Sequence, residues 1–378
     1  MLIPDIPLTL RAGKLPRMGT LASQFNQQNE PLELRIPEAA LARLTLALGR
    51  ARDFDEVWAQ AWLHGAAPER VGELLDYWCD EFDFRSAETR LNLLPLYAAN
   101  LETQPLVFVH LRSRRPDAIP LLLLHGSFGS PLEHAALFEA LCDPAAHGGR
   151  ASESFHVVCP ALPGFGLSPP HANDLTQVAE ACAEMMASLG YRRYVAHGCE
   201  LGAAIARELA ASDAERLAGA LIGDCPAYPA PDSVAVAQLS SHEKSQLALL
   251  GELHQASTLR EPDSPVALLA SALAQLADSG SSSSTFPDDL LFGLSLSLMG
   301  NGALQSRLRG ARLRESPCSD RPCGVCAFPL DAPSLRRFAE RRNRIVHWKE
   351  HERGGCMPGF EQPQLLAEQL VEFCTRFR

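Results

Sequence analysis

The chain has 378 residues, enough for one large domain with an insertion or for two domains. Hydrophobic residues make up 46% of it, an ordinary share for a protein with a packed core. A formal net charge of −11 and the lack of a basic run argue against a nucleic-acid partner. No apolar stretch reaches the roughly 18–20 residues that span a bilayer, so we expect no membrane partner either.

The eleven cysteines are an odd number scattered along the chain, which is typical of cytosolic thiols rather than of a disulfide framework. The N-terminal sequence shows no charged-then-apolar signal pattern, and both features favour a cytoplasmic location. Cys318, Cys323 and Cys326 have the spacing of three ligands of a plant-type iron–sulfur site. However, residues 323–328 have the pattern of a buried strand, in which Cys323 and Cys326 would point to opposite faces. We therefore expect no metal and no cofactor.

The first hundred residues are expected to be an extension before the main domain. Residues 1–30 are polar and predict an arm, and residues 31–104 predict a helical segment that packs on the core. A helix is expected over residues 37–50, with apolar positions at Leu41, Leu44, Leu46 and Leu48. A second helix begins at Pro68 and carries one apolar stripe, made of Val71, Leu74, Leu75, Trp78 and Phe82.

From residue 105 the pattern changes to strands that alternate with helices. Buried strands are expected at residues 106–111, 119–124, 155–159, 194–197 and 217–222. Helices are expected between them, including residues 175–189 and a helix from about Leu201. This alternation predicts an α/β fold with a mostly parallel, doubly wound sheet, whose first part covers residues 105–228.

The alternation breaks at residues 229–316, which we expect to form a helical lid. Helical periods occur at residues 234–255 and 263–277, and a serine run at residues 281–284 predicts a joint. Such an insertion would cover the carboxyl edge of the strands, where open α/β folds bind ligands. The core resumes over residues 317–378, with strands expected at 324–328 and 344–348 and a helix at 364–377.

The stretch from Tyr194 to Ile205 predicts a strand, a sharp turn and a helix, with Glu200 at the turn. Gly198 lies two residues before Glu200 and Gly202 two after it, which is the spacing of a nucleophile elbow. Glycines are needed there because the strand and helix backbones approach closely. The helix N-terminus also favours a negative charge. Close packing alone can give the same glycine spacing, so the elbow depends on the rest of the chain.

With these pieces in order, residues 32–378 resemble the microsomal-type epoxide hydrolases, a family with the α/β-hydrolase fold and an added N-terminal segment. The matching motifs are Tyr77-Trp78, Phe82-Asp-Phe-Arg85, Leu91-Asn92, His125-Gly-Ser-Phe-Gly-Ser130, Leu162-Pro-Gly-Phe-Gly-Leu-Ser168, Asp263-Ser-Pro-Val266, Phe328-Pro-Leu-Asp331, Arg353-Gly-Gly-Cys356 and Phe360-Glu361. The resemblance implies an α/β-hydrolase fold with a helical lid and an N-terminal helical extension.

The chain departs from the family pattern at the positions that match the catalytic residues of the family. The aspartate that attacks the epoxide and forms an ester is matched by Glu200, and the catalytic histidine by Cys356. The acid that orients this histidine is retained as Asp331. Two lid tyrosines of the family have no match, since all five tyrosines precede the lid; their places fall near Glu252 and Ala311.

These substitutions argue against ordinary epoxide hydrolysis. Release of the ester needs water activated by a general base, and a thiol with a pKa of ~8.5 suits this less well than imidazole with a pKa of ~6.5. A small buried filler is the plainer role for Cys356. The family pattern implies an oxyanion hole from backbone N–H groups near Ser127 or Phe128 and at Leu201, with Cys199 beside it. His197, His254 and Glu252 are further candidates, each with a structural role as the plainer alternative.

Three hypotheses of function follow. The first is an enzyme that opens an epoxide without hydrolysis and forms a C–C or C–O bond within a bulky apolar substrate, in secondary metabolism. Glu200, in a pocket that we expect to be apolar, would act as acid and base. The second is a non-catalytic protein that binds an apolar ligand. The third is an atypical hydrolase with Glu200 as nucleophile or base. A small apolar molecule is the expected partner, and a homodimer is one assembly that we consider.

Overall fold

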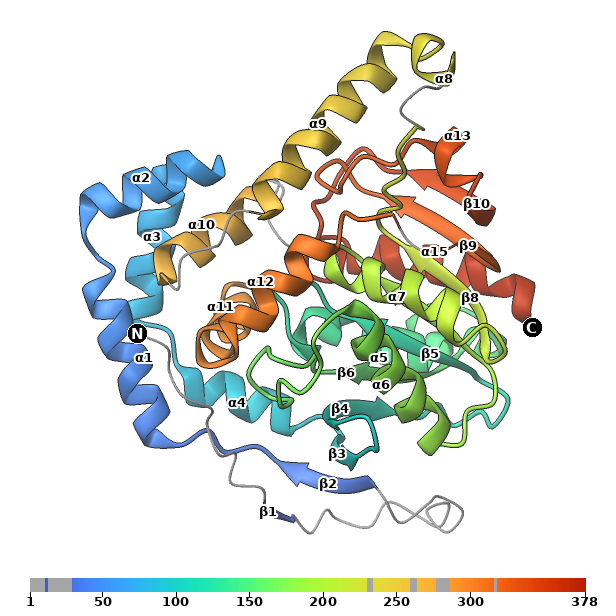
Figure 1. Cartoon of the computed structure of the whole chain (residues 1–378). Coiled ribbons are helices and arrows are strands. Elements are labelled where there is room, and N and C mark those ends of the chain that lie inside the picture. Colours follow the sequence, from blue (N-terminus) through green and yellow to red (C-terminus); the bar gives the residue numbers. More distant parts are fainter. Residues whose placement is uncertain (1–10, 13–28, 230–233, 259–263, 277–285, 316–317) are drawn as a thin grey trace.

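The structure of the protein is a computed structural model that describes residues 11–12, 29–229, 234–258, 264–276, 286–315 and 318–378. Its strands form one sheet in the order β1-β2-β3-β4-β6-β5-β7-β8-β9-β10. Figure 1 shows this sheet crossing the molecule, with helices on both of its faces. The predicted α/β architecture is confirmed.

The parallel part of the sheet runs from β6 to β10. Its strands are β5 (Ile119–Leu124), β6 (Phe155–Pro160), β7 (Tyr194–Gly198), β8 (Leu217–Ile222), β9 (Ser319–Ala327) and β10 (Asn343–Glu350). Every residue of β6, β7 and β8 is buried, because helices cover both faces of these strands. Their sequences are therefore mostly apolar, with His156 and His197 as the polar exceptions, which made them predictable.

The other edge of the sheet is antiparallel. β4 (Pro105–Leu111) pairs with β6, and β3 (Leu96–Asn100), β2 (Asn29–Glu33) and β1 (Arg11–Ala12) continue outward. β1 and the start of β2 fall within the expected arm of residues 1–30, and this part of the arm lies on the sheet. Residues 29–31 pair with β3, so hydrogen bonds with a neighbouring strand, rather than local hydrophobicity, define this element. The rest of the expected arm lies outside the described residues.

Two helical layers cover the sheet. α6 (Leu175–Ser188) and α7 (Leu201–Ser212) pack together on one face, and α5 (Ala135–Cys142) and α15 (Pro363–Cys374) on the other. The short helices α13 (Arg336–Ala339) and α14 (Pro358–Glu361) follow β9 and β10. Cys323 and Cys326 belong to different apolar clusters, as expected for residues on opposite faces of a strand.

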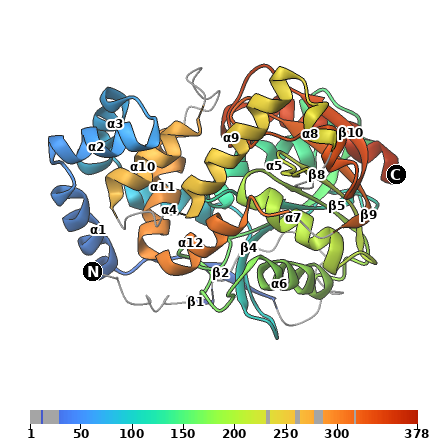
Figure 2. The same ribbon diagram turned by 45° about the horizontal axis from the view of Figure 1, so that its top comes forward.

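The N-terminal segment contains α1 (Glu38–Arg50), α2 (Phe54–His64), α3 (Pro68–Asp80) and α4 (Phe84–Asn92). These helices pack against α10 (Pro265–Ala274) and α11 (Phe286–Met299) of the lid, as Figures 1 and 2 show. The Tyr77 hydroxyl donates to Asp288 at 2.7 Å, and the Trp78 indole donates to Ser295 at 3.1 Å. Leu46 is 56% exposed, so its expected place on the apolar face of α1 is wrong.

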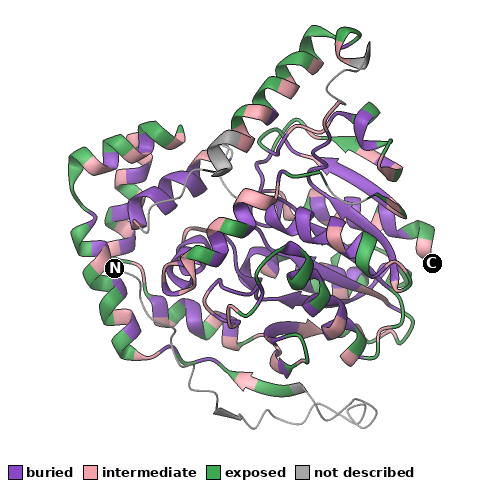
Figure 3. Cartoon of the chain, viewed as in Figure 1, coloured by how far each residue is buried: buried purple, intermediate pink, exposed green. Residues whose placement is uncertain are grey.

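The remaining lid helices are α8 (Val234–Ala237), α9 (Ser241–Thr258) and α12 (Gly302–Ala311). α9 shows many exposed and intermediate positions, whereas the central strands are buried (Figure 3). The serine run that predicted a joint lies outside the described residues. Within the described ranges, no helix has the combination of length and apolarity that a membrane crossing requires.

Candidate active site

Glu200 lies in the turn between β7 and α7, at the carboxyl edge of the parallel strands. Its backbone has φ 54° and ψ −117°, and it is the only non-glycine residue with a positive φ among those described. Such a conformation costs about 1–3 kcal/mol, so the surroundings must enforce it. A Cβ at Gly198 would lie 2.3 Å from the carbonyl carbon of Gly202, and one at Gly202 would lie 2.2 Å from the oxygen of Leu124. The two glycines therefore permit the turn that presents Glu200.

Four donors surround the Glu200 carboxylate. Oε2 accepts hydrogen bonds from the backbone N–H groups of Ser127 at 2.7 Å and Leu201 at 2.6 Å. Oε1 accepts from the Ser127 hydroxyl at 2.8 Å and forms an ion pair with Nε of Arg312 at 3.0 Å. The Glu200 side chain is only 2% exposed. The expected apolar surroundings are therefore wrong, because Ser127, Leu201 and Arg312 compensate the buried charge.

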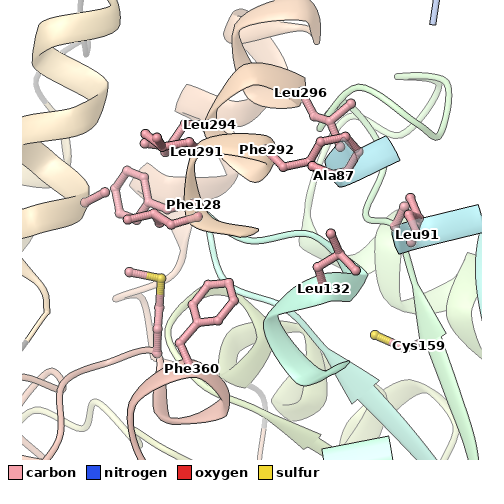
Figure 4. Close-up of a cluster of buried hydrophobic side chains, with 14 of the residues drawn as sticks. Ala87, Leu91, Phe128, Leu132, Cys159, Leu291, Phe292, Leu294, Leu296 and Phe360 are labelled. Carbon is pink, nitrogen blue, oxygen red and sulfur yellow. The ribbon is translucent and has the colours of Figure 1, made fainter. Parts of the chain in front are cut away.

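The backbone N–H groups that were expected to form an oxyanion hole therefore donate to the Glu200 side chain. Ser127 follows β5 and Leu201 begins α7, and both N–H groups point at one oxygen of Glu200. The N–H of Phe128 is not among the described donors to Glu200, and its ring lies in the apolar cluster drawn in Figure 4. A Cβ at Gly293 would lie 2.7 Å from the Phe128 carbonyl oxygen, so α11 packs directly on this loop.

Cys356 follows β10 and is buried. Its Sγ donates to Oε1 of Gln275 at 3.3 Å, and its backbone N–H donates to the carbonyl of the same glutamine at 3.1 Å. Burial raises the pKa of the thiol well above its usual value, and the carboxylates of Glu200 and Asp331 raise it further. A neutral thiol cannot activate water as a general base.

Asp331 lies in the turn after β9. Its Oδ2 accepts a hydrogen bond from the N–H of Phe328 at 2.8 Å, while Oδ1 is buried without a hydrogen-bond partner. Burial raises the pKa of Asp331 well above its usual value, and the charge of Asp224 adds to this. Both effects favour the protonated carboxyl. Among the described contacts, its hydrogen bond is to the backbone of its own turn rather than to Cys356.

The other candidates lie outside the ring of donors around Glu200. Nδ1 of His197 lies 2.9 Å from the carbonyl oxygen of Leu221, and Nε2 lies 3.9 Å from Sγ of Cys199. Burial lowers the pKa of His197 to about 4 and raises that of Cys199 well above its usual value. Both groups are therefore neutral at neutral pH and pack beneath the turn.

Two lid candidates lie on α9. The His254 ring lies 6.4 Å from the ring of Tyr228, and Glu252 is exposed. The structure does not bring either of them to the Glu200 carboxylate through a hydrogen bond or ion pair among the described residues.

Sequence reasoning missed the basic residue of the site, Arg312. It follows α12 directly and comes one position after Ala311, where the place of the second lid tyrosine was expected. Its backbone carbonyl accepts a hydrogen bond from Nη2 of Arg207 at 2.6 Å. Nη1 of Arg207 in turn donates to the carboxylate of Asp224 at 2.8 Å, and both of these side chains are 2% exposed. An arginine next to an expected aromatic position was the only signal in the sequence.

Glu133 is a second buried carboxyl near the turn that sequence reasoning missed. Its Oε2 accepts a hydrogen bond from the N–H of Gly126 at 3.0 Å. Burial raises the pKa of Glu133 to about 8, and the charge of Glu200 contributes. The described residues contain no group of three or more His, Cys, Asp or Glu side chains that could hold a metal ion. The site therefore offers carboxyl, guanidinium and backbone N–H groups for its chemistry.

Comparison with known proteins agrees with this geometry. Residues 29–134 match the family model described as epoxide hydrolase N terminus, and residues 121–369 match that of the alpha/beta hydrolase family. The sheet order, the elbow and the lid thus define an α/β hydrolase.

The relatives narrow this class. A protein of Stigmatella aurantiaca named "Putative epoxide hydrolase" is 31% identical, over 92% of this chain and 85% of its own length. "Epoxide hydrolase 1" of Oryctolagus cuniculus is 24% identical over 82% of this chain and 80% of its own length. The solved structure of the Aspergillus niger epoxide hydrolase superposes with a TM-score of 0.72 at 23% identity, over 92% of this chain and 96% of that one. The chain belongs to the epoxide-hydrolase family of α/β hydrolases.

Proposed function

We propose that this protein opens the epoxide ring of a bulky apolar substrate without hydrolysis, as a cyclase in the biosynthesis of a secondary metabolite. The attacking group is a hydroxyl or carbon nucleophile of the same substrate molecule. Glu200 acts first as base and then as acid. One observation carries the proposal: the elbow presents an ion-paired carboxylate, while the residue matched to the family's histidine is the buried neutral thiol of Cys356.

The proton transfers of a ring-forming reaction balance with one carboxylate. Glu200 takes the proton of the substrate hydroxyl as its oxygen forms a bond to an epoxide carbon. The C–O bond of the epoxide breaks, and its electron pair stays on the leaving oxygen. Glu200 then returns the proton to this alkoxide. The product is an isomer of the substrate, so no water is consumed and no water-activating base is needed.

A hydrolytic cycle fits the same residues less well. If Glu200 attacked the epoxide, its ester would need water activated by a general base for release. Neither Cys356 nor His197 supplies a strong base beside the ester. Burial raises the pKa of the Cys356 thiol, which therefore stays protonated, and lowers the pKa of His197, whose imidazole is therefore a weak base. The contact of Oε2 with two backbone N–H groups supports this nucleophilic alternative, since such donors also stabilise an ester carbonyl.

A ligand-binding protein without catalysis is the remaining alternative. It is supported by the burial of the Glu200 side chain, which is 2% exposed, and by the four donors that already satisfy its carboxylate. In that case, an apolar ligand would bind tightly, no product would form, and changes at Glu200 would not create or remove a product.

Glu200→Gln tests the proposal directly. The probe is an apolar epoxide that carries an aryl group and a hydroxyl four carbons from the ring. We expect kcat for ring formation to fall at least ~100-fold in Glu200→Gln, the usual contribution of a general base. Glu252→Gln is the matched control, because Glu252 is exposed on α9, and its kcat should be unchanged. Equal turnover by wild type and Glu200→Gln, with folding verified by thermal melting, would overturn the proposal.

A further inference from the structure

We propose that Arg312 is the electrophilic catalytic residue of this site and donates hydrogen bonds to the epoxide oxygen as the ring opens. This inference deepens the proposed function and rests on it. The basis is the position of the guanidinium, whose Nε lies 3.0 Å from Oε1 of Glu200 at the end of the lid. The Glu200 carboxylate and the Arg312 guanidinium are therefore in direct contact at the elbow.

The positive charge of Arg312 suits the step in which the C–O bond of the epoxide breaks. As the C–O bond of the epoxide breaks, its electron pair leaves an alkoxide that needs a donor in a water-poor site. A guanidinium keeps its proton at all relevant pH values and carries five N–H donors in a planar fork. Contact of Nε with Glu200 is therefore compatible with donation to a second oxygen. Arg312 stabilises the alkoxide by hydrogen bonding, and the proton that the alkoxide gains comes from Glu200.

The fold holds the backbone of Arg312 in place. Nη2 of Arg207 donates to the Arg312 carbonyl at 2.6 Å, and Nη1 of Arg207 donates to the carboxylate and the carbonyl of Asp224 at 2.8 and 2.9 Å. Arg207 lies on α7, the helix that follows the elbow, and Asp224 follows β8. A buried chain of charged groups thus connects the lid residue to the sheet that presents Glu200. This arrangement holds the Arg312 backbone beside the helix that follows Glu200.

The position of Arg312 in the lid also explains how one residue can meet both carboxylate and substrate. Its side chain is 13% exposed, whereas that of Glu200 is 2% exposed. The guanidinium is thus the more accessible member of the pair.

The first test compares Arg312→Met and Arg312→Lys with wild type on a series of epoxy alcohols. The members of the series differ in fluorine substitution next to the epoxide, which changes the basicity of the alkoxide formed. We expect Arg312→Met to lower kcat ~100-fold, with the largest loss for the most basic alkoxide, and Arg312→Lys to recover part of it. Arg314→Met is the control, because Arg314 is exposed two residues further along. A loss that is uniform across the series would mean a structural role and overturn the assignment.

A second measurement separates this inference from the proposed cyclisation. An apolar epoxide without a hydroxyl cannot cyclise, but the Glu200 carboxylate can attack its carbon and form an ester while the alkoxide takes a proton from solvent. Intact-mass spectrometry then measures the rate of adduct formation. We expect this rate to fall at least tenfold in Arg312→Met and to stay unchanged in Arg314→Met. Equal rates would overturn the role of Arg312 even if cyclisation is established. Absence of both adduct and turnover with wild type would contradict both proposals.

Discussion

The length of the Glu200 side chain determines which hydrogen-bond donors its carboxylate reaches. One extra methylene relative to aspartate extends the carboxylate by about 1.5 Å. With that reach, Oε2 accepts from the N–H of the next residue, Leu201, at 2.6 Å, and Oε1 meets Arg312. The carboxylate thus binds the donors that would otherwise face a substrate oxygen. Although glutamate and aspartate carry the same charge, glutamate at position 200 therefore changes the hydrogen bonding of the site.

Glu133 makes the stability of the fold depend on pH. Its pKa of about 8 lies above the ordinary value of 4.5, so the folded protein holds a proton that the unfolded chain has lost between these pH values. Stability contributed by this group is therefore complete below about pH 4.5 and is lost as the pH rises through 8. We expect Glu133→Gln to reduce this decline by about 1 kcal/mol per pH unit between pH 6 and 8.

Urea unfolding of wild type and Glu133→Gln at pH 6, 7 and 8 measures this difference. Comparing the two proteins removes the effect of buried histidines such as His197, whose lowered pKa acts below about pH 6.5 in both. Free energies of unfolding that change in parallel with pH would contradict the protonated state of Glu133.

Some residues of the site could be predicted from the sequence, and others could not. Glu200 and Leu201 belong to the elbow motif at a strand end, and the resemblance to the family implied that Ser127 lies near them. Arg312 and Gln275 come from the lid, where the chain is helical and the sequence carries no register against the sheet. Their contacts depend on how the lid packs on the core, which no local pattern encodes.

Among the elements, the elbow depends on its two glycines. A Cβ at Gly202 would lie 2.2 Å from the carbonyl oxygen of Leu124, so the alanine variant must displace either β5 or α7. We expect Gly202→Ala to lower the free energy of unfolding by about 3 kcal/mol. Gly72 on α3 is the control, because nothing lies within 4 Å of its added Cβ.

At that control position alanine should raise the stability by about 0.5–1 kcal/mol, since glycine is the poorer helix former. Chemical denaturation of both variants is the measurement. A Gly202→Ala protein as stable as wild type would show that the strand and helix at the elbow can separate without cost.

Elements buried on both faces were predicted well, as was the edge strand β10, but the antiparallel edge strands β2 and β3 were not. β6, β7 and β8 are buried throughout and mostly apolar, a pattern typical of strands covered on both faces. β2 and β3 are short and partly exposed, so their strand conformation depends on each other. The helix α2 was missed as well, because several of its apolar residues, including Trp62, face solvent and blur the helical period.

For the whole molecule, the N-terminal helices pack against the lid helices α10 and α11. Arg90 on α4 pairs with Asp289 on α11 at 2.9 Å, and the Asp289 side chain is 8% exposed. Arg90→Met would remove this ion pair and should destabilise the contact by about 1–2 kcal/mol. We expect amide hydrogen exchange in α11 to become roughly tenfold faster, while β5 and β7 keep their protection.

Arg43→Met is the control for this experiment, since Arg43 is exposed on α1. Faster exchange in the sheet as well as in α11 would contradict a separate N-terminal and lid unit. Unchanged exchange in α11 would show that the pair between Arg90 and Asp289 does not hold the lid.

The central claim concerns the fate of the epoxide at a site where the Cys356 thiol is neutral and Glu200 is the proposed base. The most direct measurement is the reaction of an epoxide with an internal hydroxyl in ¹⁸O-labelled water, followed by mass spectrometry of the products. The proposed mechanism predicts a cyclic product with the mass of the substrate and no ¹⁸O, because no water enters the bond-forming step. A diol that carries one ¹⁸O atom would contradict it and establish hydrolysis instead.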